Sequence, residues 1–108
     1  VLGVIDLPFL NCRYSALDGA GAYRGTERIH VRGERLTDCI VAIGDYAVGD
    51  GSEAKNAERL RITSALAGAV QRVRMFGSAA VDLAWVAEGR VGASVMLANK
   101  PWDTVAGV

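Results

Sequence analysis

The chain has 108 residues, of which 51% are hydrophobic and 22% are charged. Its 12 basic and 12 acidic side chains give a formal net charge of zero, which argues against non-specific binding to nucleic acid or acidic membranes. A chain of this length forms one domain or part of a larger one. Its two cysteines, Cys12 and Cys39, are too far apart for a CxxC pair. A disulfide framework is therefore excluded, and we expect free thiols in a cytoplasmic protein.

Both ends of the sequence fall inside expected secondary structure. Val1 lies in an expected strand and Val108 in an expected helix. The sequence has no initiator methionine, no signal peptide and no apolar run long enough to span a membrane. We therefore expect these residues to be a piece of a longer protein, whose function has to be separated from that of the piece.

The first part of the sequence predicts short strands joined by tight turns. Residues 1–7 are almost entirely apolar, which predicts a largely buried strand, and residues 12–17 predict a second strand. The glycines in residues 19–25 are spaced as G-x-G-x-x-x-G, which is one residue too long for a dinucleotide-binding loop. They predict turns around a short strand instead.

A charged segment and then an apolar segment follow. Residues 27–35 predict an exposed edge strand, and residues 39–43, bounded by Gly44, predict a central strand with Cys39 as a small core residue. His30 has no ligand-forming residue at suitable spacing, so a surface position is favoured over a metal site. As the only histidine, it completes no Ser-His-Asp or Cys-His set, and the sequence contains no P-loop.

A long amphipathic helix is expected to begin near residue 50. Asp50 at the cap and Glu53 three residues later form the pattern of a capping box. Apolar residues then recur at helical spacing for about five turns. Acidic neighbours dilute the basic residues in this region, which favours a solvated face over a phosphate-binding patch; the basic residues are Arg59, Arg61, Arg72 and Arg74.

The last part of the sequence predicts strands that alternate with helices. The expected elements are a strand at residues 72–76, a helix at 79–87, a strand at 91–97 and a helix that opens at Pro101. The helix at 79–87 is apolar apart from Asp82, so we expect it to be buried. This order predicts an α/β fold with a mixed sheet flanked by helices.

Two strand-to-helix corners carry the candidate functional residues. At the first corner, Gly77 lets a ligand approach the backbone, and the N–H groups of Ser78 and Ala79 begin a helix. A helix start of this kind binds anions or hydroxyl-rich ligands. Plain helix capping by Ser78 explains the same residues.

The second corner is Pro101-Trp102-Asp103. Pro101 suits the first position of a helix, and the helix dipole stabilises a carboxylate in the first turn. Such a carboxylate suits Mg²⁺, which prefers oxygen ligands. One carboxylate cannot hold Mg²⁺ firmly, however, and no other acid lies within ten residues of Asp103. An acid that only stabilises its own helix is the alternative.

Taken together, the two corners resemble a known family. Residues 76–90 (FGSAAVDLAWVAEGR) and 100–107 (KPWDTVAG) resemble the C-terminal half of the inositol monophosphatase family. That family has a Gly-Ser/Thr-Ala-Ala-x-Asp/Asn-Leu helix start and, at about this distance, a Trp-Asp pair that opens the next helix. Residues 3–9 (GVIDLPF) and 19–25 (GAGAYRG) resemble its hairpin region, so the resemblance covers almost the whole chain.

The resemblance implies that the longer protein is a Mg²⁺-dependent, lithium-sensitive phosphomonoesterase with a layered α-β-α-β-α fold, generally a homodimer. Residues 1–108 would form its C-terminal α/β lobe. Clustered carboxylates in this family bind metal ions that activate water and neutralise the phosphate. By resemblance, Asp103 is a metal ligand that also contacts the substrate, and Gly77, Ser78 and Ala79 line the substrate site.

The sequence departs from the family pattern in two ways. It lacks the Glu-Glu and Asp-Pro-x-Asp-Gly-Thr motifs, so we expect the 108 residues alone neither to bind Mg²⁺ tightly nor to hydrolyse phosphate esters. Met96 stands seven residues before Asp103, where inositol-specific members have a glutamate that binds ring hydroxyls. Inositol, histidinol, glycerol and sugar phosphates and nucleotide bisphosphates therefore remain candidate substrates. The alternative function is a non-catalytic lobe that serves dimerisation or scaffolding.

Overall fold

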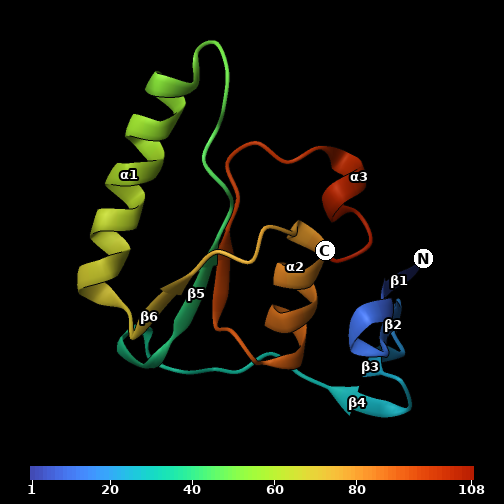
Figure 1. The fold of residues 1–108 in the computed structure, drawn as a ribbon. Helices are drawn as coiled ribbons and strands as arrows, with labels where there is room; N and C mark the ends of the chain where they lie inside the picture. The colour runs from blue at the N-terminus through green and yellow to red at the C-terminus, as the bar shows by residue number, and fades with distance from the viewer.

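The computed structural model describes all residues from 1 to 108 and places the strands in two sheets (Figure 1). One sheet is antiparallel, with the order β1-β2-β3-β4, and the other is parallel, with β5 between β6 and β7. Helices flank the sheets. The α/β class predicted from the sequence is confirmed, with the antiparallel and parallel strands divided between the two sheets.

The antiparallel sheet consists of short strands. They are β1 (Leu2–Leu7), β2 (Cys12–Leu17), β3 (Gly21–Arg24) and β4 (Glu27–Ile29), with a 3₁₀ helix (Pro8–Leu10) between the first two. In the pair of β1 and β2, Leu2 lies opposite Leu17 and Leu7 opposite Cys12. The prediction of a largely buried β1 is wrong. Its residues alternate between exposed and half-buried, because β1 is an edge strand that packs on the protein through one face.

The parallel sheet carries the most deeply buried strand. It consists of β5 (Ile40–Ile43), β6 (Arg72–Arg74) and β7 (Ala93–Val95), and a 3₁₀ helix (Leu36–Asp38) precedes β5. Val41 and Ala42 are 1% and 0% exposed. This confirms the predicted central strand, since β5 pairs with a strand on each side. Cys39 is buried as expected, and both cysteines are free.

The long helix α1 (Ser52–Ala69) stands beside β6 and has one side turned away from the protein (Figure 1). Its 18 residues match the predicted length, but the predicted capping box is wrong. The cap is Gly51, which adopts a left-handed conformation with φ 72° and moves Asp50 out of the capping position. No residue of α1 is fully buried, because the helix contacts the fold through one face only.

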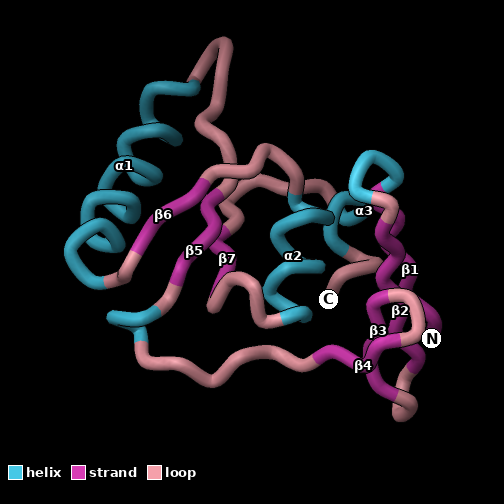
Figure 2. The backbone as a smooth tube through the Cα atoms, turned by 60° about the horizontal axis from the view of Figure 1, so that its bottom comes forward, coloured by secondary structure: helices cyan, strands magenta, loops and turns pink.

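Helix α2 (Ala79–Glu88) lies between the two sheets (Figures 1 and 2). Its small residues allow this close approach, and Ala84, 2% exposed, packs with Cys12, Tyr14 and Ile29 of the antiparallel sheet. The Tyr14 hydroxyl donates a 2.5 Å hydrogen bond to Glu88 Oε2. Burial opposes ionisation of Glu88, yet this hydrogen bond and another from Arg90 outweigh it and lower its pKa. The antiparallel sheet is thereby fixed to the end of α2.

The remaining segments lie at the surface. β4 is shorter than the edge strand predicted for residues 27–35, and His30 is exposed, as predicted. The last helix, α3 (Pro101–Thr104), is short and contacts α2. No helix in the structure is both long enough and apolar enough to cross a membrane.

Candidate functional site

The first corner is formed by the turn that enters α2. Ser78 is the cap residue, and its Oγ accepts a 3.4 Å hydrogen bond from the backbone N–H of Val81. Gly77 has φ 78°, a left-handed conformation that favours glycine. The predicted capping role of Ser78 is confirmed. The N–H groups of Ala79 and Ala80 belong to the first turn, where a helix has no internal acceptors to offer.

The second corner is formed by the start of α3, with Pro101 at its first position. The backbone N–H of Lys100 donates a 3.0 Å hydrogen bond to Asp103 Oδ2, and the N–H of Asp103 donates a 2.9 Å bond to the Lys100 carbonyl. One carboxylate oxygen of Asp103 therefore caps its own helix. The other, Oδ1, accepts no hydrogen bond from the protein and is available to a ligand.

The fold brings these two corners to one hollow, although they are far apart in the sequence. The hollow is lined by Gly77, Ser78, Ala79, Ala80, Asn99, Trp102 and Asp103. The segment after α3 runs tightly along α2, since a Cβ atom at Gly107 would lie only 2.7 Å from Leu83 Cβ. This close approach fixes the position of Asp103 relative to the start of α2. The two corners that carry the candidate residues therefore line one hollow.

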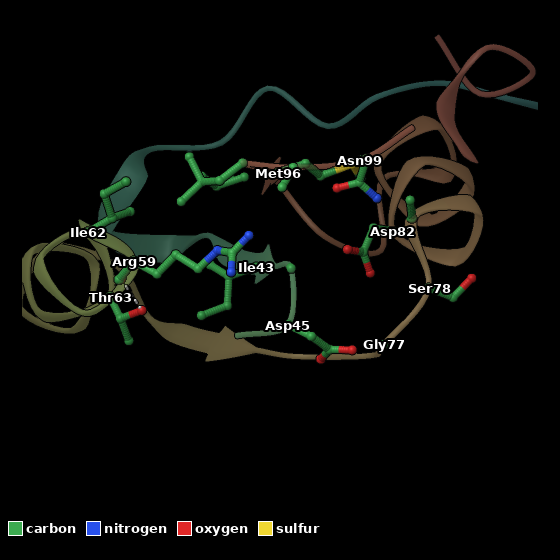
Figure 3. Close-up of a pocket in the computed structure, with 15 residues that line it drawn as sticks. Ile43, Asp45, Arg59, Ile62, Thr63, Gly77, Ser78, Asp82, Met96 and Asn99 are labelled. Atoms are coloured by element: carbon green, nitrogen blue, oxygen red, sulfur yellow. Dashed lines mark hydrogen bonds between the residues drawn. The ribbon is translucent and has the colours of Figure 1, made fainter. Parts of the chain in front are cut away.

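A second cavity of about 200 Å³ adjoins the hollow and shares Asn99 and residues 77–79 with it (Figure 3). It lies between α1, the ends of β5 and β7, and the start of α2. Three of its charged residues were not among the predicted site residues: Asp45, Arg59 and Asp82. The cavity also contains Met96, which was singled out from the sequence.

Asp82 is a carboxyl group in an almost completely buried position, 2% exposed. Its Oδ2 accepts a 3.4 Å hydrogen bond from Ser94 Oγ, and its Oδ1 has no partner. Burial raises the pKa of Asp82, the Ser94 hydrogen bond opposes this, and the nearby Asp45 carboxylate raises it further. The only signal in the sequence was that Asp82 is the one acid in the middle of an apolar helix segment.

The loop after β5 is fixed to α1 by side chains of that helix. Asn56 Oδ1 accepts a 2.7 Å hydrogen bond from the Ala47 N–H, and Asn56 Nδ2 donates a 2.8 Å bond to the Ala47 carbonyl. The hydroxyls of Tyr46 and Thr63 lie 3.3 Å apart and share a hydrogen bond. These contacts hold Asp45 at the edge of the cavity, close to Gly77.

The arginines of α1 have different surroundings. Arg61 is 76% exposed and pairs with Glu58, as expected for a solvated face. Arg59 is half-buried, lines the cavity and forms no ion pair; its Nη1 donates only a 3.4 Å hydrogen bond to Asn56 Oδ1. The prediction of a solvated face is therefore wrong for Arg59. The helix turns it towards the cavity, whereas Arg61, two residues on, points outwards.

The donor set for a metal ion is incomplete in these residues. No group of three or more His, Cys, Asp or Glu side chains is close enough to hold an ion. Asp103 Oδ1 fits the oxygen preference of Mg²⁺, but a single carboxylate does not complete a binding site.

Comparison with known proteins gives the family. The sequence profile of the inositol monophosphatase family matches residues 1–108. The chain belongs to the inositol monophosphatase family, a family of phosphatases. It is 34% identical over 108 residues to the fructose-1,6-bisphosphatase/inositol-1-monophosphatase of Thermotoga maritima, and 33% identical over 109 residues to the inositol-1-monophosphatase ImpA of Mycolicibacterium smegmatis. It covers 39% and 40% of these relatives, so it spans about two fifths of their length.

Solved structures of family members have the same fold. The extragenic suppressor protein SuhB of Bartonella henselae matches with a TM-score of 0.85 and 33% identity, over 100% of this chain and 41% of that one. The inositol monophosphatase of Anabaena matches with a TM-score of 0.80 and 34% identity, over 99% and 42%. The resemblance and fold class predicted from the sequence are therefore confirmed.

Proposed function

We propose that the full-length protein hydrolyses a phosphate monoester in a Mg²⁺-dependent reaction, and that residues 1–108 form its C-terminal lobe. The observation that carries the proposal is the meeting of Asp103 and the start of α2 in one hollow, within a chain of a phosphatase family. A free carboxylate oxygen and free backbone N–H groups face the same space, which suits a ligand that is both metal-bound and anionic.

Asp103 and the start of α2 have separate roles in the proposed reaction. Asp103 Oδ1 is one ligand of the metal, while Oδ2 remains bonded to the Lys100 N–H and keeps the carboxylate in place. When bound, the metal would activate water and neutralise charge on the phosphate. The N–H groups of Ala79 and Ala80 bind oxygen atoms of the substrate, and Gly77 and Ser78 form the wall beside them.

We propose a phosphorylated polyol or sugar as the substrate. Inositol 1-phosphate is one candidate, because relatives of the chain are named inositol-1-monophosphatases. Met96 lines the cavity beside the hollow, and its thioether is only a weak acceptor for a ring hydroxyl of inositol. Other alcohols of similar size therefore compete with inositol in this proposal.

The test is phosphate release by the full-length protein from a panel of phosphate esters, with Mg²⁺, without it, and with added Li⁺. The proposal requires release that depends on Mg²⁺ and is inhibited by Li⁺. Absence of metal-dependent release from every ester would contradict it. The 108 residues alone should be inactive, because they contribute only one of the carboxylate ligands.

The exposed face of the antiparallel sheet supports a second, non-catalytic candidate function. Leu2, Val4 and Leu17 lie on one face of the β1–β2 pair and are 65%, 46% and 51% exposed. Apolar side chains grouped in this way mark a surface for protein contact. We propose that it serves assembly into a homodimer, and sedimentation of the full-length protein tests this. A monomer at micromolar concentration would contradict it.

A further inference from the structure

Arg59 is the only basic residue that lines the cavity next to the hollow (Figure 3). Figure 3 shows its side chain extending from α1 across the cavity, beside Ile43. It is half-buried and forms no ion pair, unlike Arg61 on the outer face of the same helix. A partly desolvated guanidinium without a counter-ion is unfavourable, and an anionic group on a ligand would relieve this.

Arg59 forms one hydrogen bond with a side chain of its own helix. Asn56 Oδ1 accepts a hydrogen bond from Arg59 Nη1 while it also accepts one from the Ala47 N–H. A guanidinium has five N–H donors, so most of those on Arg59 remain available. Asn56 is itself held by two hydrogen bonds to Ala47, so it gives the guanidinium one fixed contact at the α1 side of the cavity.

We propose that this cavity binds the leaving-group part of the substrate, and that Arg59 selects an alcohol that carries a carboxylate, as in a sugar-acid phosphate. The inference rests on the proposed function, because it places the phosphate in the adjoining hollow beside Asp103. The two spaces share Asn99 and residues 77–79, so one molecule can occupy both.

The size of the cavity and the charges that line it both favour a compact leaving group with one negative charge. An engineered cavity of about 150 Å³ holds benzene, so about 200 Å³ suits a six-membered ring with small substituents. Arg59 supplies one positive charge, and the Asp45 carboxylate lines the same cavity. A carboxylate is balanced by one guanidinium, whereas a second phosphate would bring extra negative charge towards Asp45.

The opposite wall suits hydroxyl groups. Asp82 Oδ1 has no hydrogen-bond partner, and the Asn99 side chain forms no hydrogen bond within the protein. Figure 3 places both side chains at the α2 end of the cavity, away from the α1 helix that carries Arg59. Because Asp82 Oδ1 is itself buried, the exposed Asn99 amide is the group open to a hydroxyl there. A hydroxylated ring with a carboxylate at one end would therefore meet a cation on one side and the Asn99 amide on the other.

The experiment uses the full-length protein and three esters with the same sugar ring: glucose 1-phosphate, glucuronic acid 1-phosphate and glucose 1,6-bisphosphate. Hydrogen bonds to charged groups imply that the glucuronic acid ester has a kcat/KM roughly 10- to 100-fold above that of glucose 1-phosphate, mainly through a lower KM. Arg59→Gln should bring this ratio close to one, and Arg59→Lys should retain part of it. Arg61→Gln is the matched control on the outer face and should leave the ratio unchanged.

Calorimetric titration with free glucuronate and free glucose provides a readout that does not depend on turnover. The inference predicts that glucuronate binds more tightly than glucose to the wild-type protein and to Arg61→Gln, and that Arg59→Gln loses the difference. Equal kcat/KM for the two monoesters, a preference that survives in folded Arg59→Gln, or a preference for the bisphosphate would overturn it. If glucose 1-phosphate is hydrolysed without a carboxylate preference, only this inference fails. If no ester is hydrolysed, the proposed function fails and the titration still decides the role of Arg59.

Discussion

The hollow beside Asp103 and the cavity beside Arg59 share a wall, yet the chain builds them in different ways. The hollow is formed by two helix starts, each of which lies within a few consecutive residues. The cavity combines side chains from α1, the loop after β5 and α2, which only the parallel sheet brings together. The groups proposed for the reaction therefore lie in local motifs, whereas those proposed to select the substrate depend on the whole fold.

The largest expected effect is the loss of phosphatase activity caused by a change in the hollow. In the full-length protein, Asp103→Asn should reduce Mg²⁺-dependent phosphate release by about 10²–10³-fold, the size of losing one charge-stabilising group from an active site. An amide is a weaker ligand than a carboxylate for a hard cation. Asp18→Asn, on an exposed turn, is the control and should have full activity. Equal activity of the two variants would remove Asp103 from the metal site.

On the cavity side, Asp82 should make stability depend on pH. Its raised pKa means that the folded protein holds the proton more tightly than the unfolded chain. The stability from this group is thus complete below the ordinary value of 3.8 and is lost as pH rises through the folded pKa. Asp82→Asn removes the buried negative charge and its repulsion from Asp45, so its free energy of unfolding should exceed that of the wild type by about 1–3 kcal/mol at pH 7. This advantage should shrink below pH 3.8.

Urea unfolding of both proteins at several pH values measures this difference. Asp38→Asn, which removes an exposed carboxylate paired with Arg35, is the control and should not reproduce the pH dependence. A constant difference between Asp82→Asn and the wild type across the range would show that burial does not perturb this carboxyl.

Gly77 lines both the hollow and the cavity, so a substitution there tests the turn that the two regions share. Gly77→Ala should lower the free energy of unfolding by about 1–2 kcal/mol, since a Cβ atom is disfavoured in the left-handed conformation. Thermal unfolding measures the loss. Gly33→Ala is the control, because that glycine has open space around it and no positive φ. Similar melting temperatures for the two variants would contradict the strained turn.

The smallest expected effect concerns the cap of α2 alone. Ser78→Ala removes the acceptor for the Val81 N–H and should cost about 1 kcal/mol, whereas Ser78→Thr keeps an acceptor and should cost less. Chemical denaturation of the wild type and the two variants measures the order of their free energies of unfolding. If Ser78→Ala and Ser78→Thr lower the free energy of unfolding by the same amount, the hydroxyl does not act as the cap.

Local patterns were enough to predict much of the fold and the hollow. The strand at residues 12–17, the cap at Ser78 and the opening of α3 at Pro101 each depend on neighbouring residues. Asp103 was singled out from the same local motif, and its role as a metal ligand, implied by the family resemblance, stays a prediction. The burial of β1 was wrong because it depends on which strands pair, and the cap of α1 was wrong because Gly51 could take a left-handed conformation.

The cavity could not be predicted in the same way. Arg59 and Arg61 look alike in the sequence, and only the rotation of α1 against the sheet decides which one faces inwards. Asp45 follows a buried strand without any motif, and its proximity to Asp82 arises because β5 ends near the start of α2. These positions are set by long-range packing and not by local sequence.

Asp103 is proposed to bind a metal ion in the hollow that it shares with the start of α2. The most direct measurement is a crystal structure of the full-length protein with Mn²⁺, located by its anomalous signal, in place of Mg²⁺. We predict an ion bound to Asp103 Oδ1 at a distance near the ~2.1 Å of magnesium–oxygen bonds, with Oδ2 still bonded to the Lys100 N–H. Bound Mn²⁺ that leaves Asp103 uncoordinated would contradict the claim.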